Sequence, residues 1–269
     1  MRPSGVPAAA PSGAGKSTVA ELLREAGLGE NTLVFFISDN GALTLVEGDQ
    51  FASNDPLKGG KLSAFFPIGG TGAGEGNLIS GNAQNGIHVS NSSGNTIAGN
   101  YIGTDSSGTL DRGNDGAGIF LTNGAGNNTI GGLNVGDRNV IAGNGADNIK
   151  IEATAGSGNT IIGNYIGVDA AGTAVLGNGG SGVDIQANGN TVGGATAGAR
   201  NIISGSIYNG VVVSGDNNTI QGNYIGTDVT GTADLGSERN GVWINGGSNN
   251  LIGGTDAGAG NLIYGNEHN

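Results

Sequence analysis

Two side chains of opposite charge, Lys150 and Asp184, occupy the same position in adjacent copies of a repeated strand pattern. This placement predicts an ion pair between neighbouring strands. General acid–base cleavage of a glycosidic bond needs two carboxyl groups at a defined separation, and this position supplies one. His88 occupies the position in another copy without an ionisable partner, so we interpret it as a solvated surface residue. Phe120 and Trp243 also occupy it, and their rings are candidates for stacking on sugars or for cover beneath loops.

Three aspartates, Asp105, Asp169 and Asp228, recur in every second copy of the pattern. Carboxylates bind divalent cations, but two stacked copies of a strand would hold them about 9.6 Å apart. One calcium ion, with bonds of about 2.3–2.6 Å, does not bridge that distance. We therefore expect each aspartate to cap its own turn and no cofactor to bind, with calcium as the alternative.

An internal repeat must position these residues. The segment N-T-I-x-G-N-Y-I-G-x-D occurs at 95–105, 159–169 and 218–228, so its starts are 64 and 59 residues apart. Self-similarity of this kind is typical of repeat architectures. Each interval holds two structural turns of about 30 residues.

Three short strands are predicted in each turn. Inward-facing positions, two in the first strand and one in each of the others, form four columns of six residues, and every member is Ile, Val or Leu. The columns are Ile87, Ile119, Ile149, Val183, Val211 and Val242; Val89, Leu121, Ile151, Ile185, Val213 and Ile244; Ile97, Ile130, Ile161, Val192, Ile220 and Ile252; and Ile102, Ile141, Ile166, Ile203, Ile225 and Ile263. Parallel strands stacked about 4.8 Å apart, with right-handed crossovers, give an all-β, right-handed parallel β-helix of about six to seven turns.

Asparagine begins the second and third strands of the pattern. Its side chain carries donors and an acceptor, so stacked asparagines can hydrogen-bond from turn to turn as a ladder. We interpret both columns as structural rather than ligand-binding. The third-strand column is Asn77, Asn100, Asn139, Asn164, Asn201, Asn223 and Asn261, and the second-strand column is Asn95, Asn128, Asn159, Asn190, Asn218 and Asn250.

The region 68–269 resembles the bacterial right-handed parallel β-helix repeat proteins, which share the pectate-lyase-like fold. The resemblance rests on the 11-residue segment above, on G-T-A-V-L-G-N at 172–178 and on G-A-R-N-I-I-S-G at 198–205. It implies a large secreted or surface-attached bacterial protein, located outside the cell or at its surface and associated with polysaccharide. Catalytic relatives use clustered Asp, Lys and Arg on outward strand positions, some with Ca²⁺, and many members have no assigned activity.

Residues 1–30 begin with a stretch rich in Pro, Ala and Gly, and their segment 10–17 resembles the P-loop of nucleotide kinases and ATPases. The resemblance implies a phosphate-binding role for Gly15, Lys16 and Ser17. Ala10 stands where the motif has its first Gly, and no strand pattern precedes it. The alternative is a short helix over 17–26 that ends at Gly27.

Residues 31–67 resemble part of the type I sulfatases in the segments N-T-L-V-F-F-I-S-D-N-G at 31–41 and N-D-P-L-K-G-G-K at 54–61. The resemblance implies a metal-binding role for Asp39 and Asn40 and a sulfate contact for Lys61. The formylglycine motif of that family is absent from the chain, so we expect a sulfatase-derived fragment without activity. The alternative is a strand over 32–38 followed by a turn.

Composition and charge narrow the classes of function. The chain has 269 residues, 58 of them Gly, no Cys, and a net charge of −12. The charge disfavours nucleic acid as a partner, because binding to phosphates rests on Lys and Arg. No run of 18 apolar residues is present to span a membrane, and the first residues show no apolar core of a signal peptide.

The two ends of the coil would expose its core unless they are capped. We expect a helix over 17–26 and a strand over 32–38 to cover the first turn. The third-strand pattern is followed only by 266–269, which predicts an uncapped end and end-to-end self-association. The favoured function is a non-catalytic structural, adhesive or glycan-binding module. The alternative is a polysaccharide lyase or hydrolase acting on acidic glycans.

Overall fold

The computed structural model describes residues 57–58, 68–70, 72 and 75–268. The chain divides into two units, Met1–Ser53 and Asn54–Asn269, and all the described residues belong to the second. The helix and strand expected to cap the coil, over 17–26 and 32–38, lie outside the described residues. The strand Leu57–Lys58 comes from the segment 31–67 and pairs in parallel with Ile87–Ser90 of the coil.

The second unit is a parallel β-helix built from three seven-stranded sheets. The first sheet contains β1 (Leu57–Lys58), β4 (Ile87–Ser90), β7 (Ile119–Thr122), β10 (Ile149–Ile151), β13 (Val183–Ile185), β16 (Val211–Val213) and β19 (Val242–Ile244). The second contains β2 (Ile68–Gly69), β5 (Thr96–Ala98), β8 (Thr129–Gly131), β11 (Thr160–Ile162), β14 (Thr191–Gly193), β17 (Thr219–Gln221) and β20 (Leu251–Ile252). The third contains β3 (Leu78–Ile79), β6 (Tyr101–Ile102), β9 (Val140–Ile141), β12 (Tyr165–Ile166), β15 (Ile202–Ile203), β18 (Tyr224–Ile225) and β21 (Leu262–Ile263).

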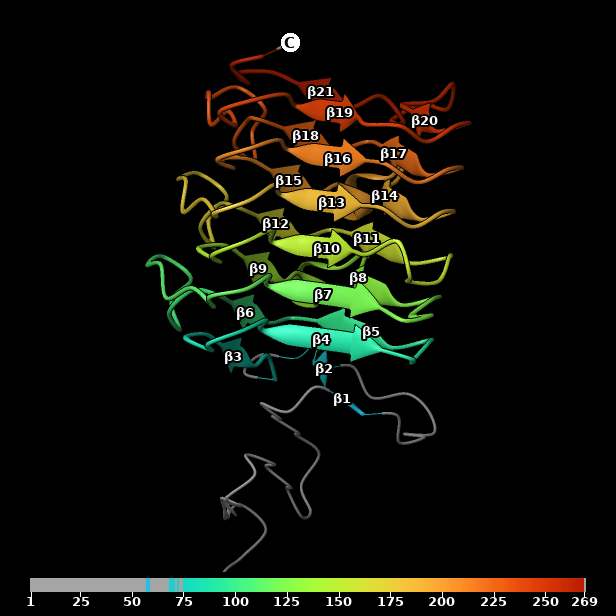
Figure 1. Cartoon of the computed structure of the whole chain (residues 1–269). Coiled ribbons are helices and arrows are strands. Elements are labelled where there is room, and N and C mark those ends of the chain that lie inside the picture. The colour runs from blue at the N-terminus through green and yellow to red at the C-terminus, as the bar shows by residue number, and fades with distance from the viewer. Residues whose placement is uncertain (1–56, 59–67, 71, 73–74, 269) are drawn as a thin grey trace, which may run out of the picture. The chain divides into compact units, whose positions relative to one another are not determined.

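The coil is right-handed and has about six turns. In Figure 1 the chain crosses the front through β7, passes behind through β8 and β9, and returns to the front one turn higher as β10. Every turn supplies one strand to each sheet, as the sequence pattern predicts. The only helices in the described part of the chain are two three-residue 3-10 helices, η1 (Val135–Asp137) and η2 (Ala197–Ala199).

The four predicted apolar columns form the core. Strand register places successive members opposite one another, as in the pairs Ile149–Val183 and Ile151–Ile185. Twenty of the 24 side chains are buried in one cluster, and Val242 and Ile252 pack against it. In the last described turn, Ile244 and Ile263 remain 47% and 41% exposed.

The predicted asparagine ladder on the third strands is complete through all seven of its members. Each Nδ2 donates to the Oδ1 of the next asparagine over 2.9–3.1 Å, from Asn77 to Asn261. The second-strand ladder joins Asn95 to Asn190 through side-chain amides. It continues to Asn250 through backbone N–H groups that donate to Oδ1. Both columns therefore have the structural role that the sequence predicts.

Glycine is required where each ladder turns a corner. Gly163 has φ +71°, and a Cβ added to it would lie 2.1 Å from the Gly132 carbonyl oxygen. An alanine at that position would combine backbone strain with a steric clash. The repeated glycines therefore let the chain bend at short intervals while successive turns remain in contact.

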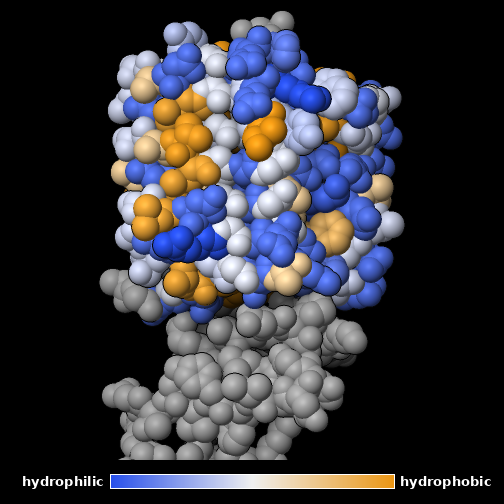
Figure 2. Space-filling view, turned by 60° about the vertical axis from the view of Figure 1, so that its left-hand side comes forward, coloured by the Kyte–Doolittle hydropathy of each residue, from blue (hydrophilic) through white to orange (hydrophobic). Residues whose placement is uncertain are grey.

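Three hairpins project from one edge of the coil at 104–111, 168–175 and 227–234. They stack on one another, because the Ala170 N–H donates to the Gly108 carbonyl and the Val229 N–H to the Gly172 carbonyl, over 2.9 and 2.8 Å. Figure 2 brings this edge forward and shows apolar patches along it. Leu110, on the first hairpin, is among the exposed apolar residues.

Candidate functional site

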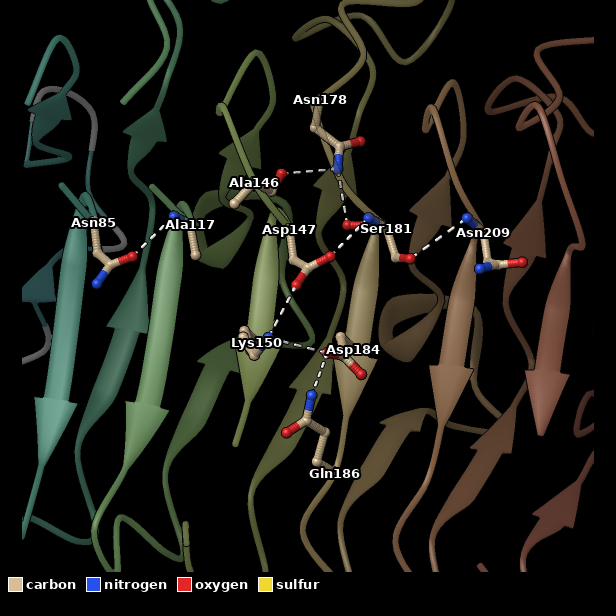
Figure 3. Close-up of polar contacts among 10 residues, drawn as sticks. All are labelled: Asn85, Ala117, Ala146, Asp147, Lys150, Asn178, Ser181, Asp184, Gln186 and Asn209. Atoms are coloured by element: carbon tan, nitrogen blue, oxygen red, sulfur yellow. Dashed lines mark hydrogen bonds and ion pairs between the residues drawn. The ribbon is translucent and has the colours of Figure 1, made fainter. Parts of the chain in front are cut away.

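The predicted ion pair between neighbouring strands is confirmed. Lys150, in the middle of β10, has its Nζ 3.4 Å from Asp184 Oδ2, in the middle of β13. The same Nζ lies 3.7 Å from Asp147 Oδ2, so one ammonium group contacts two carboxyl groups. Gln186 Nε2 donates to Asp184 Oδ2 over 2.8 Å and fixes the orientation of that carboxylate. Figure 3 shows these four side chains together on the outward face of the first sheet.

Sequence reasoning missed Asp147, because this residue precedes β10 and lies outside the alternating strand pattern. It occupies a column of small or polar residues at the corner before the first sheet. The sequence could have identified this column, because each member stands two residues before the first inward residue of its strand, as Asp147 does before Ile149. The members of this column are Asn85, Ala117, Asp147, Ser181, Asn209 and Asn240.

The side chains in this column accept hydrogen bonds from the backbone of a neighbouring turn. Asp147 Oδ1 accepts from the Ser181 N–H over 2.7 Å, and Asn209 Oδ1 accepts from the Asn240 N–H over 3.2 Å. A carboxylate therefore replaces an amide at one step of a largely neutral column. Burial raises the pKa of Asp147, and the neighbouring charge of Asp184 raises it further, against the opposing effects of the Ser181 N–H and Lys150.

A shallow hollow of about 250 Å³ opens beside Asp184 on the same face. Its lining combines aromatic rings with amide, hydroxyl and charged groups. Trp243 and Tyr208, both in the lining, are 42% and 41% exposed. The polar lining residues are Ser181, Asp184, Gln186, Asn209, Ser214, Arg239 and Asn245.

Arg239 links the corner of one turn to that of the turn below it. Its guanidinium carbon lies 4.5 Å from the centroid of the Tyr208 ring. Its backbone N–H donates to the Tyr208 carbonyl over 3.0 Å. The stacked cation restrains the ring at the rim of the hollow.

The structure places the two predicted aromatic candidates at separate points of one column. Trp243 lines the hollow, whereas Phe120 lies four strands away, a distance of about 19 Å along the coil. Phe120 is half-buried and packs against His88, with ring centroids 5.0 Å apart. The sequence did not indicate Tyr208 or Arg239, which lie at a corner rather than in a strand.

The three repeated aspartates cap their own hairpins, as predicted. Asp105 Oδ1 accepts from the Thr109 and Leu110 N–H groups over 2.9 and 3.0 Å, and Asp169 and Asp228 repeat the arrangement. Hydrogen bonds lower the pKa of Asp105 and of Asp228 to about 2, the largest contributions coming from the Ser107 hydroxyl and the Ala233 N–H respectively. Within the part of the chain that the structure describes, no group of three or more His, Cys, Asp or Glu could hold a metal ion.

The candidate residues of the first 67 positions lie outside the described residues. These are Gly15, Lys16 and Ser17 of the P-loop-like segment and Asp39, Asn40 and Lys61 of the sulfatase-like segments. Their roles remain predictions from the sequence.

No protein-family model, curated protein or solved structure matches this chain. Among the residues described, no helix is long and apolar enough to cross a membrane. The described part of the chain is a parallel β-solenoid with a polar, partly aromatic hollow on its first sheet.

Proposed function

We propose that the outward face of the first sheet binds glycan chains and that the coil is a non-catalytic recognition module. The observation that carries this proposal is the exposure of Trp243 and Tyr208 in one shallow hollow between amide and hydroxyl side chains. Aromatic rings offer an apolar face to a sugar ring, while amides and hydroxyls match its hydroxyl groups as donors and acceptors. A long, regular coil also suits a structural or adhesive role in a larger secreted or surface-attached bacterial protein.

Charge favours neutral glycans over polyanionic ones. The chain carries a net charge of −12, and Lys150 is neutralised by contacts with two carboxyl groups. Arg239 is the one basic side chain in the lining of the hollow, and Asp184 opposes it there. A polyanion would therefore meet net repulsion at this face.

A glycan array of neutral and acidic polysaccharides, with and without Ca²⁺, tests the proposal. Trp243→Ala should weaken binding about tenfold, because the loss of one stacked ring costs about 1.4 kcal/mol. Tyr264→Ala is the matched control, since this ring is 53% exposed and lies outside the hollow. The proposal fails if the wild-type chain binds no glycan, or if both variants weaken binding equally.

The second candidate is a polysaccharide hydrolase, favoured by the pair Asp147 and Asp184 on either side of Lys150. A half-buried carboxyl group with a raised pKa suits proton donation, and a second carboxylate nearby suits activation of water. Reducing-end and unsaturated-product assays separate this candidate from simple binding. Turnover that Asp147→Asn and Asp184→Asn both abolish, with binding retained, would establish a catalytic role for the pair.

A further inference from the structure

A third ladder runs along the corner between the third and first sheets. Its members follow a Gly in each turn and are Asn82, Asn114, Asn144, Asn178, Ser206, Ser237 and Asn266. Backbone hydrogen bonds join successive turns along this corner, including 2.7 Å from the Gly179 N–H to the Asn144 carbonyl and 3.0 Å from the Glu238 N–H to the Ser206 carbonyl. The main chain therefore holds the turns together along this column.

Side-chain bonding in this ladder is complete only at its start. Asn82 Nδ2 donates to Asn114 Oδ1 over 2.6 Å, and Asn114 Nδ2 donates to Asn144 Oδ1 over 2.8 Å. The next step fails, because Asn144 Nδ2 turns to Asn148 Oδ1 instead, over 2.9 Å. Asn148 stands where the neighbouring turns have Gly118 and Gly182 before the first inward residue, and its side chain diverts the ladder.

The diverted ladder leaves polar atoms buried. Asn178 uses its Nδ2 to donate to the Ala146 and Ser181 carbonyls, as Figure 3 shows. Asn178 Oδ1, Ser206 Oγ and Ser237 Oγ then find no hydrogen-bonding partner among the described residues. All three residues are at most 6% exposed. Asn148 Nδ2, a donor, is buried and without a partner in the same part of the coil.

Strand spacing explains why these atoms do not bond to one another. Adjacent turns lie about 4.8 Å apart, whereas a hydrogen bond between two oxygens spans about 2.8 Å. Asparagines in adjacent turns can bond directly, because Nδ2 of each points towards one neighbouring turn and Oδ1 towards the other. A serine has a shorter side chain with one polar atom. Serine hydroxyl groups in adjacent turns, stacked at the strand spacing of about 4.8 Å, are therefore too far apart to bond directly.

We propose that buried water molecules occupy this corner, one bridging Asn178 Oδ1 to Ser206 Oγ and one bridging Ser206 Oγ to Ser237 Oγ. A water molecule both donates and accepts, so it satisfies a carbonyl oxygen and two hydroxyl groups in sequence. Each bridge consists of two bonds of about 2.8 Å, which fits the spacing between turns. At these two steps of the third ladder, water takes the place of the missing amides.

A high-resolution crystal structure of the full chain is the direct test. The expected result is electron density for one water molecule within hydrogen-bonding distance of each bridged pair of side-chain oxygens. Hydroxyl groups of Ser206 and Ser237 that donate to protein carbonyls, with no density between the turns, would overturn the proposal.

Thermal unfolding of Ser206→Ala gives an independent test, because the proposal predicts whether Tm falls or rises. If the hydroxyl binds water, its removal leaves that water without a partner and lowers Tm. If the hydroxyl is dry and unpaired, its removal relieves a desolvation cost and raises Tm, which would contradict the proposal. Ser204→Ala is the matched control, because the Ser204 hydroxyl is buried and donates to the Thr227 carbonyl over 2.8 Å, so its loss lowers Tm in either case.

Restoring asparagine should displace the water. In Ser206→Asn/Ser237→Asn the added amides can reach the neighbouring turns, so we expect a higher Tm and no density between the turns at these positions. Water density that persists beside both new amides would contradict the bridging role.

Discussion

The guanidinium carbon of Arg200 lies 4.1 Å from the centroid of the Tyr224 ring, one turn further along the coil. Its Nε donates to the Gly222 carbonyl over 3.2 Å, so the same side chain contacts both the ring and the backbone beside it. Arg138 repeats this arrangement two turns earlier, 4.0 Å from the Tyr165 ring centroid. Each arginine directly follows a 3-10 helix. Its cation–π contact therefore connects the corner after that helix to the next turn of the coil.

Removing this contact should destabilise the coil. Arg200→Ala loses the cation–π interaction and the hydrogen bond to the next turn, and we expect the free energy of unfolding to fall by about 1–2 kcal/mol. Arg200→Lys should recover part of the loss, because an ammonium keeps the charge but not the planar contact. Urea unfolding followed by circular dichroism measures both variants. Arg112→Ala is the control, since that side chain is exposed and has no ring partner among the described residues; an equal loss there would refute the role of the ring.

The centre of the complete ladder should be the most sensitive asparagine position. Asn164 is fully buried, donates to the Ile130 and Ile162 carbonyls and to Asn201 Oδ1, and accepts from Asn139 Nδ2. Asn164→Ala leaves several of these groups unpaired, so we expect a loss of about 3 kcal/mol or more in the free energy of unfolding. Urea unfolding at neutral pH provides the measurement.

Asn77→Ala is the matched control for the ladder. Asn77 is the first member, is half-buried, and its side chain bonds only to Asn100 within the described residues. Its replacement should therefore cost clearly less than that of Asn164. Equal losses at the two positions would show that the ladder is not stronger at its buried centre.

The fold was predictable because its determinants are local and repeated. The inward columns rest on a period of two, and residues such as Ile161 and Ile220 can be aligned by residue type and spacing alone. The third ladder escaped prediction because two of its seven members are serines and because its break depends on the direction in which Asn144 turns its amide. That direction is a property of packing, which the sequence pattern does not contain.

The candidate site was predictable only in part, for a related reason. Lys150, Asp184 and Trp243 lie on strands, where side chains alternate between the inward and outward faces of the sheet, so the sequence predicts that all three point outward. Tyr208 and Arg239 directly precede Asn209 and Asn240 and so share one position of the repeat, but the other turns have Gln84, Gly116, Ala146 and Gly180 there, and this mixture of residue types shows no pattern. Whether a corner side chain reaches the face of a sheet depends on the path of the chain at that corner, which the residue types at this position do not indicate.

The contribution of each core side chain to stability should fall towards the last described turn. Ile151 is fully buried in the second column of the first sheet, whereas Ile244 in the same column is 47% exposed. Ile151→Ala should cost about 2–5 kcal/mol through lost burial and the remaining cavity, and Ile244→Ala less than about 1 kcal/mol. Thermal and urea unfolding of the two variants, which carry identical chemical changes, measure the difference. Similar losses would show that Ile244 is covered in solution.

Replacing Asp147 by asparagine should stabilise the protein at neutral pH. The raised pKa means that the folded state binds the proton of Asp147 more tightly than the unfolded state does. Its contribution to stability is therefore present below the unfolded pKa of about 3.9 and is lost as pH rises through the folded value. An amide avoids this loss, and its oxygen can still accept from the Ser181 N–H, as Asn209 Oδ1 does from the Asn240 N–H.

The pH profile of Tm distinguishes this cause from a general effect of the substitution. Asp147→Asn should raise Tm at pH 7, and its advantage over the wild type should shrink as pH falls towards 4. Asp105 and Asp228, whose pKa values are lowered to about 2, make the wild type and the variant less stable by the same amount as pH falls towards 4, so their effect cancels from the difference in Tm. A variant that is less stable at pH 7 would mean that the contact with Lys150 outweighs the cost of burying the carboxylate.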